Sequence, residues 1–302
     1  MKTMLHRLLP CLGLLLLVTL ASKVSAQVSS ELTGTLKKVR ASGTVVLGHR
    51  ESSLPFSYVT GKGEAQGYSI ELCRALVDAM SEALGKELRI KWQSVTSSNR
   101  IDQLETGQID LECGSTTNNA QRRERVAFSP IIFVAGTKLL VRQGSTIKSY
   151  RDLSGKAVAV TAGTTNERTV QELAAKQQLK VKLTSAPDHE QAYSLLSSGA
   201  VEAFATDDVL LYGLINHHKS QQQFSVVGDY MSYDPYGIMY RKGDTAMKEL
   251  VESTFYKLAQ DGELQHIYDK WFLTRLPGGE RMNLPMSAQL DSIFRSMSNR
   301  PE

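Results

Sequence analysis

The sequence predicts an α/β protein built of two lobes. Strand-like and helix-like segments alternate from residue 44 to residue 113, and the alternation begins again at residue 156. Such alternation is typical of βαβ units, and the second series points to a second lobe. A long apolar stretch separates the two series and a further strand follows the second, so we expect two crossing strands between the lobes.

The elements of the first series follow from their apolar spacing. Residues 67–84 carry apolar side chains at helical intervals, and residues 88–93 alternate as a strand does. A short helix at 99–106 ends at Gly107, because glycine favours the helix terminus. The remaining strands are expected at 44–48, 109–113 and 130–141.

The second series has the same character. Strands are expected at 156–161, 180–184, 201–205 and 224–227, and helices at 165–177, 188–198 and 207–217. A strand at 236–240 and helices at 244–260 and 263–272 come next, and 286–297 is compatible with a helix. If the chain crosses twice, lobe 1 comprises 27–136 plus 236–302, and lobe 2 is the inserted segment 137–235.

The first 26 residues have the pattern of an export signal. Lys2 and Arg7 precede an apolar run, and Val24-Ser25-Ala26 is a small-residue cleavage site. The run is shorter than the roughly 20 apolar residues that a membrane-spanning helix needs, so we expect cleavage and a periplasmic product. The segment holds three of the 35 basic residues and no acidic one, which leaves 32 against 31. This near-neutral balance gives no indication of a nucleic-acid partner.

Two of the three cysteines, Cys73 and Cys113, lie beyond the signal. In an oxidising compartment they could pair, or they could remain as two buried thiols. We favour the buried thiols, because Cys73 falls on the apolar face of a predicted helix and Cys113 follows a predicted strand. The spacing matches no metal motif, and we expect neither a metal nor a cofactor.

Arginines stand beside small hydroxyl residues at three places where a strand ends or a helix begins. The segments are His49-Arg50-Glu51-Ser52-Ser53, Ser97-Ser98-Asn99-Arg100, and Gly114-Ser115-Thr116-Thr117 with Arg122 after it. Such places present free backbone N–H groups, and guanidinium matches a carboxylate with a planar fork. Several of these at one cleft would hold a small molecule with more than one carboxylate.

Four stretches together carry a family resemblance: VVLGHRESSLPFSY, GYSIELCRALV, TSSNRIDQLETGQIDLECGSTTNNAQRRERVAFS and DLSGKAVAVTAGTT. From about residue 36 to about 285 the chain resembles the extracytoplasmic solute-binding proteins of polar amino-acid ABC transporters. Within that family it is most similar to the glutamate/aspartate binders of Gram-negative bacteria. The resemblance implies the type II periplasmic-binding-protein fold, with two crossing strands as hinge and a ligand cleft between the lobes.

The resemblance also implies how the cleft holds an amino acid. Arg122 would bind the α-carboxylate, and Ser115 and Thr117 would complete that anion site. Thr164 and Thr165 would donate from the opposite lobe, where Gly163 opens a helix. Asp207 would take the ammonium group, with its neighbour Asp208 as the alternative.

The side-chain pocket would decide specificity. Arg50, Ser97, Arg100 and His189 stand at the positions that contact the distal carboxylate in the dicarboxylate binders. A neutral or basic ligand would leave Arg50 and Arg100 facing each other unpaired, at a cost on the order of several kcal/mol. L-Glutamate or L-aspartate would supply the missing anion, and the sequence does not rank one above the other.

Each of these residues also has a purely structural interpretation. Arg50 and Arg100 could be solvated surface residues, as most arginines are. His189 and Asp207 could cap helices, and the pair Thr164 and Thr165 could do the same. The resembling proteins carry a second cysteine near residue 238, where this chain has Ile238. Cys113 therefore lacks its expected partner, and the sequence does not show whether Cys73 takes that place.

The sequence thus favours a monomeric binding protein that performs no chemistry. It would capture glutamate or aspartate by hinge closure and dock transiently on the membrane permease of an ABC importer. The alternative is an exported enzyme similar to cyclohexadienyl dehydratase, which occurs on the same fold. Such an enzyme needs a general acid or base, for which Glu51 and Glu112 are the candidates.

Overall fold

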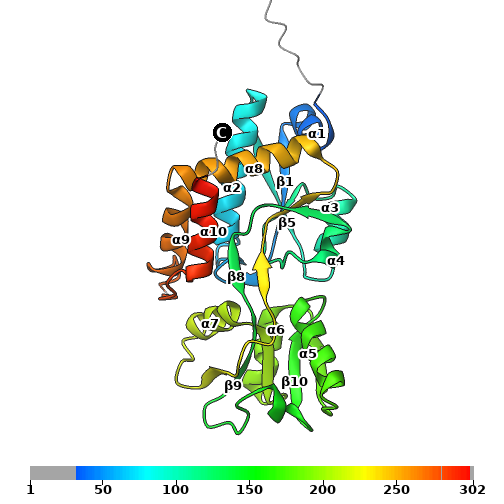
Figure 1. Cartoon of the computed structure of the whole chain (residues 1–302), viewed down its shortest axis with the longest axis vertical. Helices are drawn as coiled ribbons and strands as arrows, with labels where there is room; N and C mark the ends of the chain where they lie inside the picture. The colour runs from blue at the N-terminus through cyan, green and yellow to red at the C-terminus, as the bar shows by residue number, and fades with distance from the viewer. Residues whose placement is uncertain (1–31, 280, 300–302) are drawn as a thin grey trace, which may run out of the picture. The chain divides into compact units, whose positions relative to one another are not determined.

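The computed structural model describes residues 32–279 and 281–299. The predicted signal peptide at 1–26 therefore lies outside the described residues. Within them, the mixed α/β architecture is confirmed, with two lobes that each contain a five-stranded sheet. In Figure 1 the chain leaves the first sheet along β8 (Phe133–Ala135) and enters the second through β9 (Thr137–Arg142).

Lobe 1 contains the sheet of strand order β5-β1-β6-β15-β7. Its strands are β1 (Thr44–His49), β5 (Arg89–Ser94), β6 (Leu111–Glu112), β7 (Val126–Phe128) and β15 (Met239–Arg241). β1 lies parallel to β5 and β6, whereas β15 runs antiparallel to β6 and β7. A small sheet is formed by β2 (Ser52–Ser53), β3 (Ser57–Val59) and β4 (Ala65–Gln66).

The helices of lobe 1 come from both ends of the described chain. They are α1 (Gly34–Ser42), α2 (Tyr68–Leu84), α3 (Arg100–Glu105), α4 (Ala120–Arg123), α8 (Thr245–Gln260), α9 (Glu263–Phe272) and α10 (Ala288–Ser298). α2 buries Ile70, Cys73, Leu76 and Met80 on one face, as its apolar spacing predicts. These side chains join an aromatic cluster that includes Phe56.

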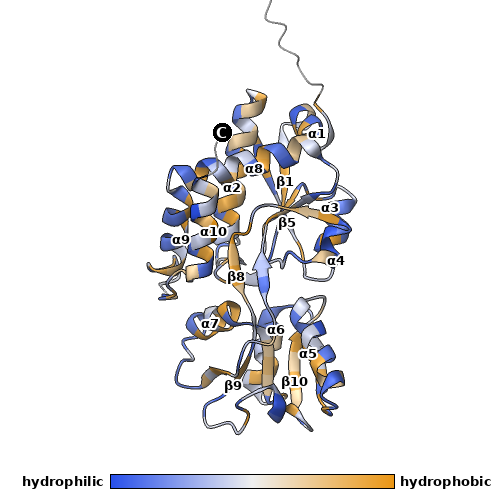
Figure 2. Ribbon diagram, viewed as in Figure 1, coloured by the Kyte–Doolittle hydropathy of each residue, from blue (hydrophilic) through white to orange (hydrophobic). Residues whose placement is uncertain are grey.

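Lobe 2 contains the sheet of strand order β11-β10-β12-β9-β13. Besides β9 its strands are β10 (Ala157–Thr161), β11 (Lys182–Ala186), β12 (Ala203–Asp207) and β13 (Phe224–Val227). Its helices are the 3-10 helix η1 (Tyr150–Leu153), α5 (Thr165–Lys176), α6 (His189–Ser198) and α7 (Asp208–His217). Figure 2 shows β8 and β10 as hydrophobic and the helices α3 and α4 as mostly hydrophilic, in keeping with buried strands and exposed helix faces.

Two crossing strands pair between the sheets. β14 (Asp234–Tyr236) runs antiparallel to β8, with Tyr236 opposite Phe133. The expected single strands at 130–141 and 236–240 are both interrupted. A Cβ on Gly136, which lies at the break between β8 and β9, would be 2.5 Å from the backbone oxygen of Ser232, so the close approach of the two chains there requires glycine.

The expectation of two free buried thiols is wrong. Cys73 and Cys113 form a disulfide, with Cα atoms 6.2 Å apart, and both residues are fully buried. Cys73 lies on the core face of α2 and Cys113 directly follows β6, as expected. The pairing depends on how α2 packs on the sheet, which a separation of 40 residues does not reveal.

Candidate functional site

Eight of the ten predicted binding residues line one small cavity, which has a volume of about 10 Å³. They are Ser97, Arg100, Ser115, Thr117, Thr164, Thr165, His189 and Asp207. Asn166 and Leu210, which the sequence analysis did not select, complete the lining. The other two predicted residues, Arg50 and Arg122, are buried beside it. The structure therefore brings all ten positions together.

The ends of parallel strands place these side chains. Arg50 follows β1, and Ser115 comes shortly after the neighbouring parallel strand β6. In lobe 2, Asp207 ends β12, which lies parallel to β10. Ligands in open α/β sheets bind beyond the carboxyl ends of the strands, and the cavity lies at that edge of both sheets.

The two lobes contact each other at this cavity. The hydroxyl oxygens of Thr117 and Thr165 are 3.2 Å apart, which joins lobe 1 to the start of α5. Arg122 donates from Nη2 to the carbonyl oxygen of Gly163 at 3.5 Å. Ser98 Oγ donates to the carbonyl of Ala162 at 3.2 Å. A ligand in the cavity would touch residues of both lobes.

Arg50 and Arg100 are each only 2% exposed, so the surface interpretation is wrong for both. Arg100 donates from Nη1 to Thr116 Oγ1, and the same nitrogen lies 3.7 Å from Glu112 Oε1. Burial, and after it the charge of Arg100, lowers the pKa of Arg50 to about 9. Burial also lowers the pKa of Arg100. The pair is charged at neutral pH, although the site penalises that charge.

Four buried donors at the cavity have no hydrogen-bond partner among the described residues. They are Arg50 Nη1, Arg100 Nε, Ser97 Oγ and Ser115 Oγ. A buried donor without a partner costs roughly 1–3 kcal/mol, so such groups are rarely left together without a purpose. Guanidinium and hydroxyl donors that converge in this way fit an acceptor with several oxygens, such as a carboxylate.

His189 lies at the start of α6 but does not cap it. The cap is Asp188, whose side chain accepts from the backbone N–H of Gln191 at 2.8 Å. The His189 ring is 1% exposed, with Nδ1 2.8 Å from Thr161 Oγ1. Burial, together with the charges of Arg50 and Arg100, holds the His189 pKa well below its ordinary value. The imidazole is therefore neutral and adds no charge to the arginine pair.

Asp207 is a buried acid without a capping bond. It occupies the N-cap position of α7 but makes no side-chain cap hydrogen bond there. Oδ1 accepts from Asn166 Nδ2 at 2.8 Å, and Oδ2 accepts from the Tyr236 hydroxyl at 2.5 Å. Burial and the nearby charge of Asp234 raise the Asp207 pKa well above its ordinary value. A cation placed beside this carboxylate would relieve that penalty.

Asp208, the alternative to Asp207, is engaged elsewhere. Its Oδ2 accepts from the Tyr230 hydroxyl at 2.7 Å, and its Oδ1 accepts from the backbone N–H of Gly136 at 3.4 Å. It does not line the cavity. The geometry therefore favours Asp207 as the acid that faces the site.

Arg122 is held at the edge of the cavity by α4. Asn119 caps this helix, accepting from the Arg122 backbone N–H at 2.9 Å, and the guanidinium donates from Nη1 to the carbonyl of Thr117 at the same distance. Burial, and after it the charge of Arg100, lowers the Arg122 pKa to about 9. This cation is buried like the arginine pair, and it carries the same penalty.

The capping interpretation is confirmed for Thr164. Its Oγ1 accepts from the backbone N–H of Glu167 at 3.1 Å and donates to the carbonyl of Thr161 at 2.7 Å. That hydroxyl is already used at the start of α5. Thr165 is the next residue. The donors that the start of α5 presents to the cavity are therefore the Thr165 side chain and the first backbone N–H groups of the helix.

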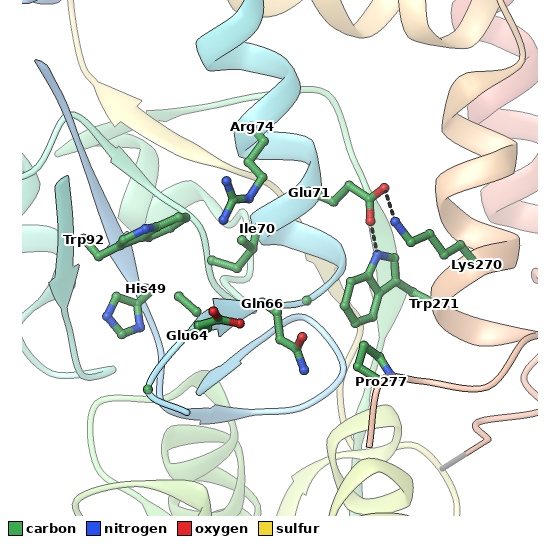
Figure 3. A pocket seen from close by; sticks show the side chains of 13 residues that line it. His49, Glu64, Gln66, Ile70, Glu71, Arg74, Trp92, Lys270, Trp271 and Pro277 are labelled. Atoms are coloured by element: carbon green, nitrogen blue, oxygen red, sulfur yellow. Dashed lines mark hydrogen bonds and ion pairs between the residues drawn. The ribbon is translucent and has the colours of Figure 1, made fainter. Parts of the chain in front are cut away.

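A larger hollow of about 710 Å³ lies on lobe 1, and none of the ten predicted residues lines it. In Figure 3, dashed lines join Glu71 to Lys270 and Trp271, whereas none reaches Glu64 or Arg74. Glu71 accepts from Lys270 Nζ and from the Trp271 indole N–H, and Arg74 stacks over Trp92 at 5.1 Å. None of its described lining residues is among the buried side chains that lack a hydrogen-bond partner. Volume alone does not identify the site.

Other kinds of site receive no support within residues 32–279 and 281–299. No group of three or more His, Cys, Asp or Glu side chains is arranged there to hold a metal ion. No helix in the same ranges is long and apolar enough to cross a membrane.

Comparison with known proteins gives a family match. Residues 45–274 match the model of the bacterial extracellular solute-binding proteins, family 3. An L-glutamate/L-aspartate-binding protein of Pseudomonas aeruginosa is 42% identical over 292 residues, which cover 95% of this chain and 97% of the relative. A glutamate/aspartate import solute-binding protein of Escherichia coli is 38% identical over 294 residues, or 96% and 97% of the two chains.

The fold has solved counterparts. An ancestral arginine-binding protein bound to arginine superposes with a TM-score of 0.69 at 29% sequence identity. The match covers 76% of this chain and 98% of the ancestral protein. This similarity supports the architecture of two lobes with one five-stranded sheet in each.

Proposed function

Because this chain belongs to the bacterial extracellular solute-binding proteins, family 3, we propose that it captures an acidic amino acid, L-glutamate or L-aspartate, in the periplasm. It then delivers the ligand to the membrane permease of an ABC importer. Relatives named for glutamate and aspartate cover nearly the whole chain, which supports the ligand class. The observation that carries the proposal is the set of buried, unpartnered donors around Arg50 and Arg100.

The charges of the cavity complement a zwitterion with one extra carboxylate. Arg122 binds the α-carboxylate, and Asp207 with its raised pKa receives the ammonium. Arg50 and Arg100, with Ser97 and the neutral ring of His189, bind the distal carboxylate. A side chain without a charge would leave two buried cations with the carboxylate of Glu112 alone. Breaking such buried pairing costs about 3–5 kcal/mol, which disfavours neutral amino acids.

The mechanism is closure of the two lobes around the ligand. Lobe 1 spans 27–136 plus 236–302 in this proposal, lobe 2 spans 137–235, and β8 and β14 form the hinge. A ligand that touches Arg122 in one lobe and Asp207 in the other favours the closed arrangement, because only that arrangement makes both contacts. The permease then recognises the closed, monomeric protein. The N-terminal signal at 1–26 directs the chain across the membrane.

The enzyme alternative has weaker support. Glu51 is exposed, and its Oε1 accepts from Ser94 Oγ at 2.6 Å, outside the cavity lining. Glu112 does not line the cavity, and its Oε2 accepts from Thr116 Oγ1. The relatives named above are solute-binding proteins. We therefore propose a binding function without catalysis.

Calorimetric titration of ligand-stripped protein tests this proposal. Glutamate, aspartate, glutamine and asparagine would be titrated in parallel into the mature chain. We expect heat from one or both acids and at least about a hundredfold weaker binding of the amides, as a loss of about 3 kcal/mol implies. Equal binding of acids and amides would refute the acidic-ligand assignment. Incubation with prephenate tests the alternative, and its consumption would favour the enzyme.

A further inference from the structure

Glu112 is a buried carboxylate among the arginines to which the proposed ligand contacts assign no role. It is 0% exposed and ends β6, where it pairs with Gly48 of β1 and Met239 of β15. Its Oε2 accepts from Thr116 Oγ1 at 2.7 Å. Its Oε1 has no hydrogen-bond partner among the described residues and lies 3.7 Å from Arg100 Nη1. The carboxylate thus keeps one oxygen free towards the cations.

All three buried arginines have Glu112 as a counter-charge. Burial lowers the pKa of Arg50, Arg100 and Arg122, and the charge of Glu112 opposes this effect at each of them. Asp188 also acts on Arg50, but it is part-exposed and its carboxylate is used to cap α6. The charge of Glu112 acts on all three arginines, whereas that of the buried Asp207 acts on Arg100 and Arg122.

The surrounding chain fixes the Glu112 carboxylate against Gly114, which also packs on the side chain of Arg50. A Cβ on Gly114 would lie 2.2 Å from Glu112 Oε1 and 3.0 Å from Arg50 Cγ, so only glycine permits this approach. Ser69 of α2 donates from Oγ to the Gly114 carbonyl at 2.8 Å. One helical turn further along α2, Cys73 is bonded to Cys113. The segment 112–114 is thus anchored on α2 at two points.

The distal part of the site has a net charge of one. Arg50 and Arg100 are cations, His189 is neutral because of its lowered pKa, and Glu112 carries the opposing charge. One ligand carboxylate brings this group to neutrality. Two negative charges on the ligand side chain would leave an excess anion, which is repelled by the Glu112 carboxylate without a further cation to offset it.

We propose that Glu112 is a specificity-determining residue: it limits the Arg50–Arg100 pair to one net positive charge, so the site prefers side chains with one negative charge over those with two. The inference rests on the proposed function, because it takes the distal carboxylate to bind at this pair. It adds a substrate class that the site rejects, namely amino acids with a phosphate monoester or similar dianion.

Titration of wild-type protein and Glu112→Gln with glutamate, glutamine and O-phospho-L-serine tests the proposal. Phosphoserine places its phosphorus as many bonds from Cα as the distal carboxyl carbon of glutamate, and it is largely doubly charged at pH 7.5. The Glu112→Gln substitution keeps the size of the side chain and an oxygen that can accept from Thr116. We expect the affinity of phosphoserine relative to glutamate to rise about tenfold or more, and that of glutamate relative to glutamine to rise at least threefold. Unchanged or lowered ratios would overturn the proposal.

A charge-balanced variant keeps the test decisive if Glu112→Gln does not fold. Arg50→Gln alone brings the distal group to zero net charge and should lose most of its preference for glutamate over glutamine. The double variant Arg50→Gln with Glu112→Gln returns the group to one positive charge. We expect it to regain at least tenfold of that preference. A double variant no more selective than Arg50→Gln would contradict the role of Glu112.

Thr116→Val separates charge from positioning. It removes the hydroxyl that links Glu112 to Arg100 and leaves every charge in place. We expect its phosphoserine-to-glutamate ratio to stay within threefold of wild type. The same shift as in Glu112→Gln would show that hydrogen bonding, rather than charge, explains the effect, and the proposal would fall. Failure of wild type to bind glutamate would instead refute the proposed function itself.

Discussion

At the scale of single residues, the site is an arrangement of charged side chains whose burial is energetically unfavourable. Burial lowers the pKa of Arg50 and Arg122 to about 9 and raises that of Asp207. A folded chain keeps such groups when a partner of opposite charge offsets the cost. In the proposed complex the two carboxylates and the ammonium of an acidic amino acid are those partners.

Asp207 provides a residue-scale prediction about pH. Burial raises its pKa when no ligand charge lies beside it, so it takes up a proton at a higher pH than an ordinary aspartate. The ligand ammonium requires the ionised form, so binding releases a proton below that pKa. We expect glutamate affinity to fall as the pH is lowered through the pKa of Asp207. Because that pKa is raised, the fall should begin at a higher pH than the ordinary aspartate pKa of about 4 would give. Titrations in buffers of different ionisation enthalpy measure the released proton.

The matched variant for this prediction is Asp207→Asn. It removes the charge and retains an oxygen that can accept from Tyr236 or Asn166. We expect about a hundredfold or greater loss of glutamate affinity and no proton release that depends on this position. Wild-type affinity that does not change with pH, or an Asp207→Asn variant that binds as tightly as wild type, would argue against Asp207 as the ammonium site.

At the scale of elements, the sequence predicted most helices and strands because their apolar spacing is regular. The strand at 224–227 and the helix at 263–272 agree with β13 and α9. α1, β7 and the small sheet were missed because they are short or carry little periodic apolar pattern. The interruption of both crossing strands and the pairing of Cys73 with Cys113 depend on contacts between distant segments, which local patterns do not encode.

Gly213 in α7 makes lobe closure testable. A Cβ there would lie 2.3 Å from the backbone oxygen of Leu54 in lobe 1, whereas alanine is favoured over glycine inside a helix by about 1 kcal/mol. We expect Gly213→Ala to preserve or raise the thermal stability of the ligand-free protein and to weaken glutamate binding at least tenfold. Calorimetry and thermal unfolding measure the two effects. Gly61→Ala is the control, since nothing lies within 4 Å of its added Cβ.

Tight glutamate binding by Gly213→Ala would show that the lobes need not approach each other at this point. If Gly213→Ala were less stable than wild type without ligand, position 213 and Leu54 would also be in contact in the ligand-free protein. Either outcome would require a different account of closure.

The disulfide provides a second prediction for the elements. Cys73 and Cys113 are separated by 40 residues, and chain entropy predicts a stabilisation of about 4 kcal/mol for a loop of that size. We expect the double variant Cys73→Ala with Cys113→Ala to lose stability of this order in urea unfolding. Oxidised wild type treated with reductant serves as the comparison. An unchanged unfolding midpoint would mean that the disulfide adds nothing to the free energy of unfolding.

At the scale of the whole molecule, the site lies at the carboxyl ends of the parallel strands of both sheets. Each lobe supplies part of the charge pattern: the arginines come from lobe 1, and Asp207 and His189 come from lobe 2. The residues of the site could be predicted because the stretches that carry them resemble those of a known family. Asn166 was not predicted, and Glu112 was considered only as a catalytic acid or base, since the contacts of both depend on the folded site. The contacts with the ligand remain a prediction.

The measurement that tests the central claim most directly is the ratio of the glutamine and glutamate dissociation constants. It should be determined for wild type, Arg100→Gln and Arg125→Gln, the last being a control because Arg125 is exposed and paired with Glu105 and Asp102. We predict that the ratio is about a hundred or more for wild type and for Arg125→Gln. For Arg100→Gln we predict a ratio of about ten or less. A wild-type ratio near one, or full selectivity in Arg100→Gln, would contradict the account.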